Sequence, residues 1–176
     1  MAEYQVEPNK KLTGADSEAI LNALNKVAII SVTDNNGNIV HVNEKFTEIS
    51  KYSYDELIGQ NHRILKSGDQ PHEMFVELWK TITAGKVWRG EIKNLAKDGS
   101  YYWVDTSIAP VLNQIGEPER YVSIRFLITE KKTLAEKFES QMETLEKMNK
   151  FMIDREFKMI ELKEKVQELK NNSAEN

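Results

Sequence analysis

The fold is decided by residues 87–111, VWRGEIKNLAKDGSYYWVDTSIAPV. Apolar or small residues at positions 88, 90 and 92 alternate with charged residues at 89, 91 and 93, which is the period of a half-buried strand. Lys97-Asp98-Gly99-Ser100 is a tight-turn signal, and Tyr101–Val111 continues as a second strand. Asn94 shares the inward face of the first strand, where a polar side chain needs a partner. The stretch therefore predicts an antiparallel hairpin with one polar residue on its buried face.

Further elements lie on both sides of this hairpin. Three more strands are predicted at Val27–Thr33, Ile39–Val42 and Arg120–Ile128. Helices are predicted at Ser17–Lys26 with Asp16 as its cap, at 44–50, 54–58 and 61–65, and at 71–83. Asn43 is expected to cap the helix that follows it. This order predicts an α+β fold in which one sheet carries its helices on one face.

The amino-acid composition argues against several classes of function. The 176 residues are 40% hydrophobic and carry a net charge of −4, which argues against a general nucleic-acid binder. Cysteine is absent, which excludes disulfides, thiolate metal sites and cysteine nucleophiles. The three histidines lack the spacing of a metal site or a nucleophile–base pair, so no enzyme is expected. The absence of a secretory or membrane-spanning run predicts a cytoplasmic protein without membrane insertion.

The last 46 residues differ from the rest. They contain 10 basic and 10 acidic residues and no Gly or Pro, which predicts one long helix. Positions at alternating spacings of three and four are mostly apolar, as in a coiled coil: Leu134, Phe138, Gln141, Leu145, Met148, Met152, Arg155, Met159, Leu162, Val166 and Leu169. We call this set the seam. It predicts a parallel homodimer, and a helix folded back on its own domain is the alternative. The predicted division is a flexible N-terminus at 1–15, a domain at 16–129 and a coiled coil at 130–172.

A second apolar stripe lies beside the seam. It consists of Phe151, Ile153, Phe157 and Ile160. It either widens the dimer contact or forms a docking face for a further helix or output module. The sequence leaves both interpretations open.

Several short stretches together resemble the PAS family of sensory domains. They are IISVTD at 29–34, VNEKF at 42–46, YDELIG at 54–59, KDGS at 97–100 and IAPV at 108–111. The resemblance implies a five-stranded antiparallel sheet with helices over one face and a ligand, when present, between them. It also implies that the terminal helix leads to an output kinase, cyclase or other effector domain. Leu127 stands where the family usually has an acidic residue before this helix.

Residues 59–65, GQNHRIL, are similar to the signature of the blue-light photoreceptor group. In that group a Cys attacks the flavin, and here His62 occupies its place. An imidazole cannot form this thiol adduct, so that photochemistry is excluded. The nearer resemblance is to the redox-sensing flavin domains of aerotaxis receptors and nitrogen-fixation regulators. It is carried by residues 59–71, Leu78-Trp79, Trp88-Arg89-Gly90, Lys93-Asn94 and Tyr102-Trp103-Val104, and Ser123-Ile124-Arg125 resembles the aerotaxis group.

This resemblance implies a flavin site. The predicted cofactor-contacting residues are Ser31, Asn61, His62, Trp79, Trp88, Asn94 and Arg125. FAD is the expected cofactor, and FMN or an unfilled pocket are the alternatives. Trp79 and Trp88 would supply apolar area, and Asn94 would supply a donor and an acceptor. A ligand-free dimerisation and relay module is the main alternative function. A sensor of another small molecule is the next alternative, and haem at His72 is the least favoured.

The orientation of Arg125 is left open by the sequence. Alternation alone turns Val122, Ile124, Phe126 and Ile128 inward and Arg125 outward. The photoreceptor resemblance implies that Arg125 faces the ligand. That orientation requires a cover, such as the N-terminal helix or a dimer mate, over the opposite apolar face.

Overall fold

The structure is a computed structural model that describes the backbone of residues 13–174 and the side chains of the same range except 167–170 and 172–174. The predicted flexible segment at 1–15 lies mostly outside the described residues. The chain divides into two compact units after Thr129. Each unit is described by itself below.

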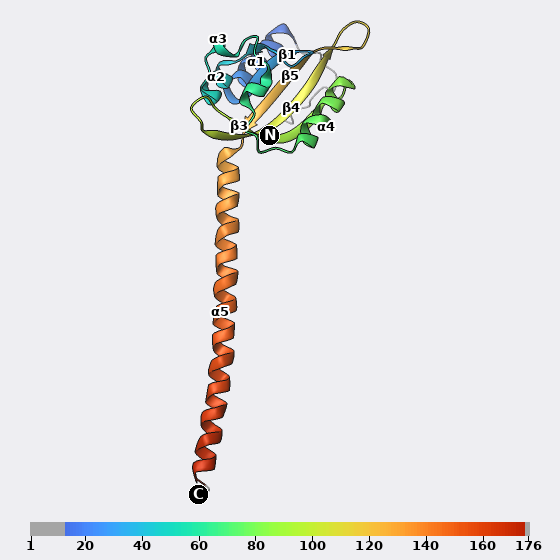
Figure 1. Ribbon diagram of the computed structural model, residues 1–176. Coiled ribbons are helices and arrows are strands. Elements are labelled where there is room, and N and C mark those ends of the chain that lie inside the picture. The colour runs from blue at the N-terminus through green and yellow to red at the C-terminus, as the bar shows by residue number, and fades with distance from the viewer. Residues whose placement is uncertain (1–12, 175–176) are drawn as a thin grey trace, which may run out of the picture. The chain divides into compact units, whose positions relative to one another are not determined.

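The first unit is built on the predicted five-stranded antiparallel sheet, with strand order β2-β1-β5-β4-β3 (Figure 1). The strands are β1 at Ile29–Asp34, β2 at Ile39–Val42, β3 at Trp88–Leu95, β4 at Tyr101–Leu112 and β5 at Pro118–Leu127. The hairpin β3–β4 therefore forms one edge of the sheet. Its partner β5 pairs with β1 at the centre, where Ser31 lies opposite Ser123 and Ile29 opposite Arg125.

Short helices fill the connection between β2 and β3. They are α2 at Glu44–Ser50, α3 at Tyr54–Leu57, the 3-10 helix η1 at His62–Leu65 and α4 at His72–Thr83. Leu78 and Ile82 of α4 pack against Trp88, Ile108 and Tyr121 in one buried cluster. A second cluster gathers around Phe46 and Leu57. The helices thus cover one face of the sheet and position the site described below.

Helix α1, at Gly14–Val27, begins earlier than the sequence predicts. Asp16 is not its N-cap: Thr13 is, and Asp16, the third residue of the helix, completes the same capping box. The side chain of Thr13 accepts from the backbone N–H of Asp16, and the Asp16 carboxylate accepts from that of Thr13. The sequence predicts Asp16 as the cap because aspartate and threonine are both favoured at the N-cap of a helix.

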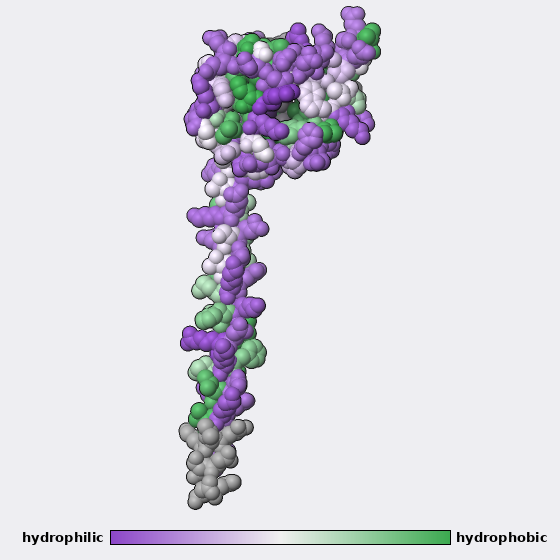
Figure 2. Space-filling view, viewed as in Figure 1, coloured by the Kyte–Doolittle hydropathy of each residue, from purple (hydrophilic) through white to green (hydrophobic). Residues whose placement is uncertain are grey.

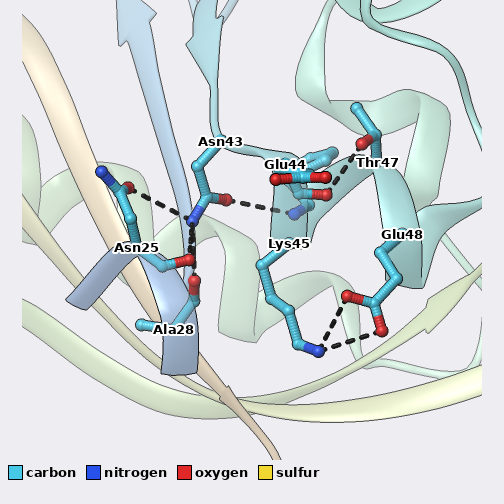
Figure 3. Close-up of polar contacts among 8 residues, drawn as sticks. Asn25, Ala28, Asn43, Glu44, Lys45, Thr47 and Glu48 are labelled. Atoms are coloured by element: carbon cyan, nitrogen blue, oxygen red, sulfur yellow. Dashed lines mark hydrogen bonds and ion pairs between the residues drawn. The ribbon is translucent and has the colours of Figure 1, made fainter. Parts of the chain in front are cut away.

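Asn43 has the predicted capping role and an additional one (Figure 3). Its Oδ1 accepts from the backbone N–H of Phe46 over 3.1 Å and from that of Ile30 over 2.9 Å. Its Nδ2 donates to the carbonyl of Ala28 over 2.8 Å and to that of Asn25 over 3.3 Å. One buried amide therefore joins the end of α1, the start of β1 and the start of α2.

The second unit is helix α5, at Thr129–Ala174, whose first residue closes the first unit. Its described seam side chains are exposed, with Leu134 at 66%, Met152 at 59% and Leu162 at 56%. The predicted stripe at 151–160 is exposed as well. Figure 2 shows hydrophobic residues set among hydrophilic ones along the coloured part of this helix. A single copy of α5 thus leaves its apolar seam uncovered, and the predicted coiled coil stays a prediction.

No helix among the described residues is both long and apolar enough to cross a bilayer.

Candidate functional site

A cavity of about 580 Å³ lies between the sheet and the segment that contains η1 and α4. Phe75, Leu78 and Ile82 of α4, with Ile92 of β3 and Ile108 of β4, give it apolar walls. Its volume falls in the range typical of small-molecule and cofactor sites. Polar side chains enter it from β1, β3, β5, η1 and the loop before α4. The cavity can therefore hold a planar apolar body and bind its polar edge.

Arg125 is the most deeply buried charged group on the cavity wall, at 4% exposure. One of its guanidinium nitrogens, Nη1, donates to Oγ of Ser31 over 3.1 Å, and Nη2 donates to Nε2 of His62 over 2.8 Å. Its guanidinium also lies 5.7 Å from the ring centre of Phe46. All three of these partners are neutral in this arrangement.

His62 is fixed in its neutral form by this contact. An arginine can only donate, so Nε2 of His62 must carry a lone pair and the ring proton must lie on Nδ1. Burial and, next, the charge of Arg125 hold the pKa of His62 well below its usual value. The imidazole therefore stays uncharged at neutral pH and presents no second positive charge to the cavity.

The charge of Arg125 itself survives burial. Burial lowers the pKa of Arg125 to about 10, which still leaves the guanidinium charged at neutral pH. The other ionisable residues on the cavity wall are basic or tyrosine: Arg63, Lys66, His72, Lys93 and Tyr121. Among them, Lys93 is paired with Asp69. No Asp or Glu belongs to the described cavity wall, so the site is electropositive.

Asn94 is 6% exposed and reaches the cavity from β3, beside Tyr102 of β4. Burial raises the pKa of Tyr102 to about 12, although the charge of Arg125 and a hydrogen bond with Asn94 act in the opposite direction. The phenol is therefore neutral over the physiological range. Asn94 offers its remaining donor and acceptor capacity to the cavity.

Two buried polar atoms on the cavity wall have no hydrogen-bond partner among the described residues. They are Nε2 of Gln70 and Oγ of Ser123. Buried polar groups are nearly always paired, so both atoms are available to a ligand's polar edge or to an ordered water. Sequence reasoning missed them. Period-two spacing from Arg125 would have put Ser123 on the same face, whereas nothing in the pattern of the loop at 66–71 singles out Gln70.

Six of the seven predicted site residues line the cavity: Ser31, Asn61, His62, Trp79, Asn94 and Arg125. Asn61 already uses its amide within the protein, since Nδ2 donates to the carbonyl of Asn36 over 3.0 Å and Oδ1 accepts from Nε of Arg63 over 2.8 Å. The rings of Trp79 and Tyr121 pack edge to face, with 5.8 Å between their centroids. These positions bring the predicted polar and aromatic groups together.

Trp88 is the exception, because it is absent from the described cavity wall. Its indole folds back over Gly90, where an added Cβ would lie 2.5 Å from the ring, and it packs in the cluster around Leu78 and Ile108. The sequence predicts a cofactor contact here because the indole would supply apolar area to a flavin ring. A residue on an inward strand face can also pack in the core, and Trp88 does so here.

The sequence leaves open whether Arg125 points toward the ligand or away from it, and in the structure Arg125 points into the cavity. Tyr121, Ser123 and Arg125 are the buried face of β5, whereas Phe126 is 46% exposed. The outward orientation suggested by alternation is wrong. The buried face of this strand is polar because it lines the cavity, and the apolar residues lie on the opposite face of the sheet.

Comparison with known proteins agrees with this architecture. Residues 26–130 match the profile of the family described as "PAS domain". A nitrogen fixation regulatory protein from Klebsiella pneumoniae is 38% identical over 117 residues, which are 66% of this chain and 24% of that protein. The aerotaxis receptor of Escherichia coli (strain K12) is 35% identical over 107 residues, which are 61% of this chain and 21% of the receptor.

A solved structure described as an RNA-binding light-oxygen-voltage receptor superposes with a TM-score of 0.64 at 23% identity. The match covers 79% of this chain and 41% of that one. At this identity it shows that the fold is shared and nothing more. The chain spans about a quarter of the length of the curated relatives it matches.

Proposed function

This chain belongs to the PAS domain family, and we propose that it is a cytoplasmic sensor module that binds a flavin, FAD, in the cavity. Its relatives are a regulatory protein and a receptor, which supports a sensory rather than an enzymatic role. The proposal includes a relay of the flavin's redox state through a dimeric α5 to an output kinase, cyclase or other effector domain.

The main support for this function is that the cavity suits a flavin ring in size and in lining. The ring needs an apolar slot and a few donors and acceptors at its polar edge. The cavity provides apolar walls and converging polar groups from Asn94, Arg125, Gln70 and Ser123. The last two contribute the buried atoms without a partner.

FAD is favoured over other flavins by charge. Arg63, Lys66 and His72 lie together along 62–72, and Arg63 and Lys66 are exposed. Basic side chains at the open part of the cavity suit the phosphate groups that a flavin nucleotide carries beyond its ring. Two phosphates engage more of these groups than one, which favours FAD over FMN and both over riboflavin.

A titration tests this function. Ligand-free protein is mixed with FAD, FMN or riboflavin, and quenching of flavin fluorescence is followed to saturation. We expect one flavin per chain and the tightest binding for FAD. Saturable binding of none of the three would overturn the proposal in favour of a ligand-free relay module. A Soret band in the purified protein would favour haem.

The relay is proposed to start at Tyr102. Its side chain contacts Asn94 on the cavity wall. The next residue, Trp103, donates its backbone N–H to Oγ1 of Thr129 over 2.9 Å and accepts from the N–H of Ile128 over 2.9 Å. A change at Asn94 can therefore displace the backbone that holds the first residue of α5.

A further inference from the structure

Arg125 is a buried charge that has no counter-charge in contact with it among the described residues. Its described contacts are with Ser31, the neutral ring of His62 and the face of Phe46. Tyr102 of β4 also interacts electrostatically with it, and burial keeps this phenol protonated. No carboxylate is among the described contacts of Arg125.

Such a charge is expensive without a ligand. A buried ion loses its hydration, and proteins ordinarily compensate this loss with an opposite charge. The contacts with Ser31 and His62 satisfy part of the guanidinium's hydrogen-bonding capacity. They do not neutralise its charge, because both partners are uncharged. The guanidinium also lies on the cavity wall, so a ligand can reach it.

We propose that the cavity selects the negatively charged form of its ligand, which it stabilises through Arg125. The exposed Arg63 and Lys66 on the same wall add positive potential of longer range, whereas Lys93 is paired with Asp69. For a flavin, and so resting on the function proposed above, the inference is that the ring is held best in the form that carries negative charge. The chemical class of ligand is then a planar ring system that accepts an electron pair.

Sulfite is a probe for this property. Its sulfur lone pair forms a bond to N5 of the oxidised flavin, and an electron pair moves to the N1–C2 carbonyl region of the ring. No oxidant or reductant is consumed, and the ring gains a negative charge. The visible flavin band bleaches as the adduct forms, so the dissociation constant of sulfite reports how well the site stabilises an anion.

The test compares four proteins, each saturated with FAD: the wild-type protein, Arg125→Met, Arg125→Lys and Arg120→Met. Arg120 is the matched control because it is an exposed arginine on the same strand and is absent from the described cavity wall. We expect Arg125→Met to weaken sulfite binding by roughly ten- to a hundredfold, the range of a lost charged hydrogen bond. Arg125→Lys keeps the charge and should lose less, and Arg120→Met should match the wild type. Equal sulfite affinity in Arg125→Met and the wild type would overturn the inference.

A second readout separates this inference from the flavin proposal. If none of the four proteins binds FAD, the proposed function fails, and thermal unfolding of the ligand-free proteins decides the inference. An uncompensated charge destabilises the ligand-free fold, and the existing 3.5 Å contact between Oγ of Ser31 and Nε2 of His62 can still join these two side chains once the arginine is gone. Arg125→Met should therefore raise the unfolding midpoint, and a lower midpoint than that of Arg120→Met would contradict the inference.

Discussion

Nη2 of Arg125 donates to Nε2 of His62 over 2.8 Å, and this contact joins β5 to η1 across one end of the cavity. The contact requires a neutral imidazole, because a protonated ring would place two donors against each other. Ser31 completes the cluster by accepting from the same guanidinium. Position 62 therefore has a different use here from the thiol of the photoreceptor group: its lone pair holds the buried arginine.

Acid should destabilise the protein through His62. The pKa of His62 is depressed in the folded state, so the unfolded chain binds the proton first as pH falls. Its contribution is present above the unfolded pKa of about 6.5 and is lost as pH falls below that value, with a slope of at most about 1.4 kcal/mol per pH unit. Urea unfolding at pH 7.5, 6.5 and 5.5 measures it.

The control for this experiment is His62→Gln, which keeps an acceptor for Arg125 and does not titrate. We expect its free energy of unfolding to fall less over the same range. Parallel curves for the two proteins would show that His62 is not the group responsible. His41 is exposed, so His41→Gln should behave like the wild type.

Replacing Asn43 by Ala should be strongly destabilising. The change removes the cap of α2 and leaves backbone groups of Ile30 and Ala28 without their partner. We expect a loss of about 2–4 kcal/mol in the free energy of unfolding, from the cost of a lost cap together with buried unsatisfied groups. Ser53→Ala removes an exposed cap, that of α3, and should cost about 1 kcal/mol. Equal losses in denaturant unfolding would contradict the structural role given to Asn43.

Gly37→Ala should reveal the contact between the β1–β2 turn and Trp79. Gly37 has φ of +83°, and an added Cβ would lie 3.1 Å from the Trp79 ring on the cavity wall. Gly99→Ala is the matched control, because Gly99 has φ of +85° and open space around it. Both variants share the backbone strain of about 1 kcal/mol.

The difference between these two variants isolates the displacement of Trp79. We expect Gly37→Ala to lose more stability than Gly99→Ala and also to weaken flavin binding. Unchanged flavin affinity in both variants would show that the position of Trp79 does not matter to the ligand.

The exposed seam of α5 should hold two chains together. The double variant Met152→Lys/Leu162→Lys places charges at two seam positions and should give monomers by light scattering. Asp154→Lys/Glu164→Lys introduces the same residues off the seam and should leave dimers. Dimers in both variants would mean that another surface joins the chains, and monomers in the wild type would remove the coiled coil.

The sequence predicted the strands and helices well because alternation, turn residues and caps are local signals. The hairpin at 87–111 forms β3 and β4, and Asn43 caps α2. The start of α1 was misplaced because Thr13 and Asp16 share one capping box, and either residue type is a good cap.

The candidate site was harder to predict because it depends on which side of the sheet the cavity lies. Arg125 faces the cavity against the alternation of its own strand, since that strand carries polar residues on its buried side. Trp88 and Asn94 share a strand face, yet the first packs in the core and the second reaches the cavity. Gln70 enters from a loop whose path no period describes.

Flavin binding in the cavity is tested most directly by the visible absorption spectrum of the purified protein after saturation with FAD and removal of the excess. We expect oxidised-flavin bands at one flavin per chain, and a loss of bound flavin in Asn94→Ala while the fold is kept. A colourless protein that stays colourless after incubation with FAD, with a native circular dichroism spectrum, would contradict flavin binding.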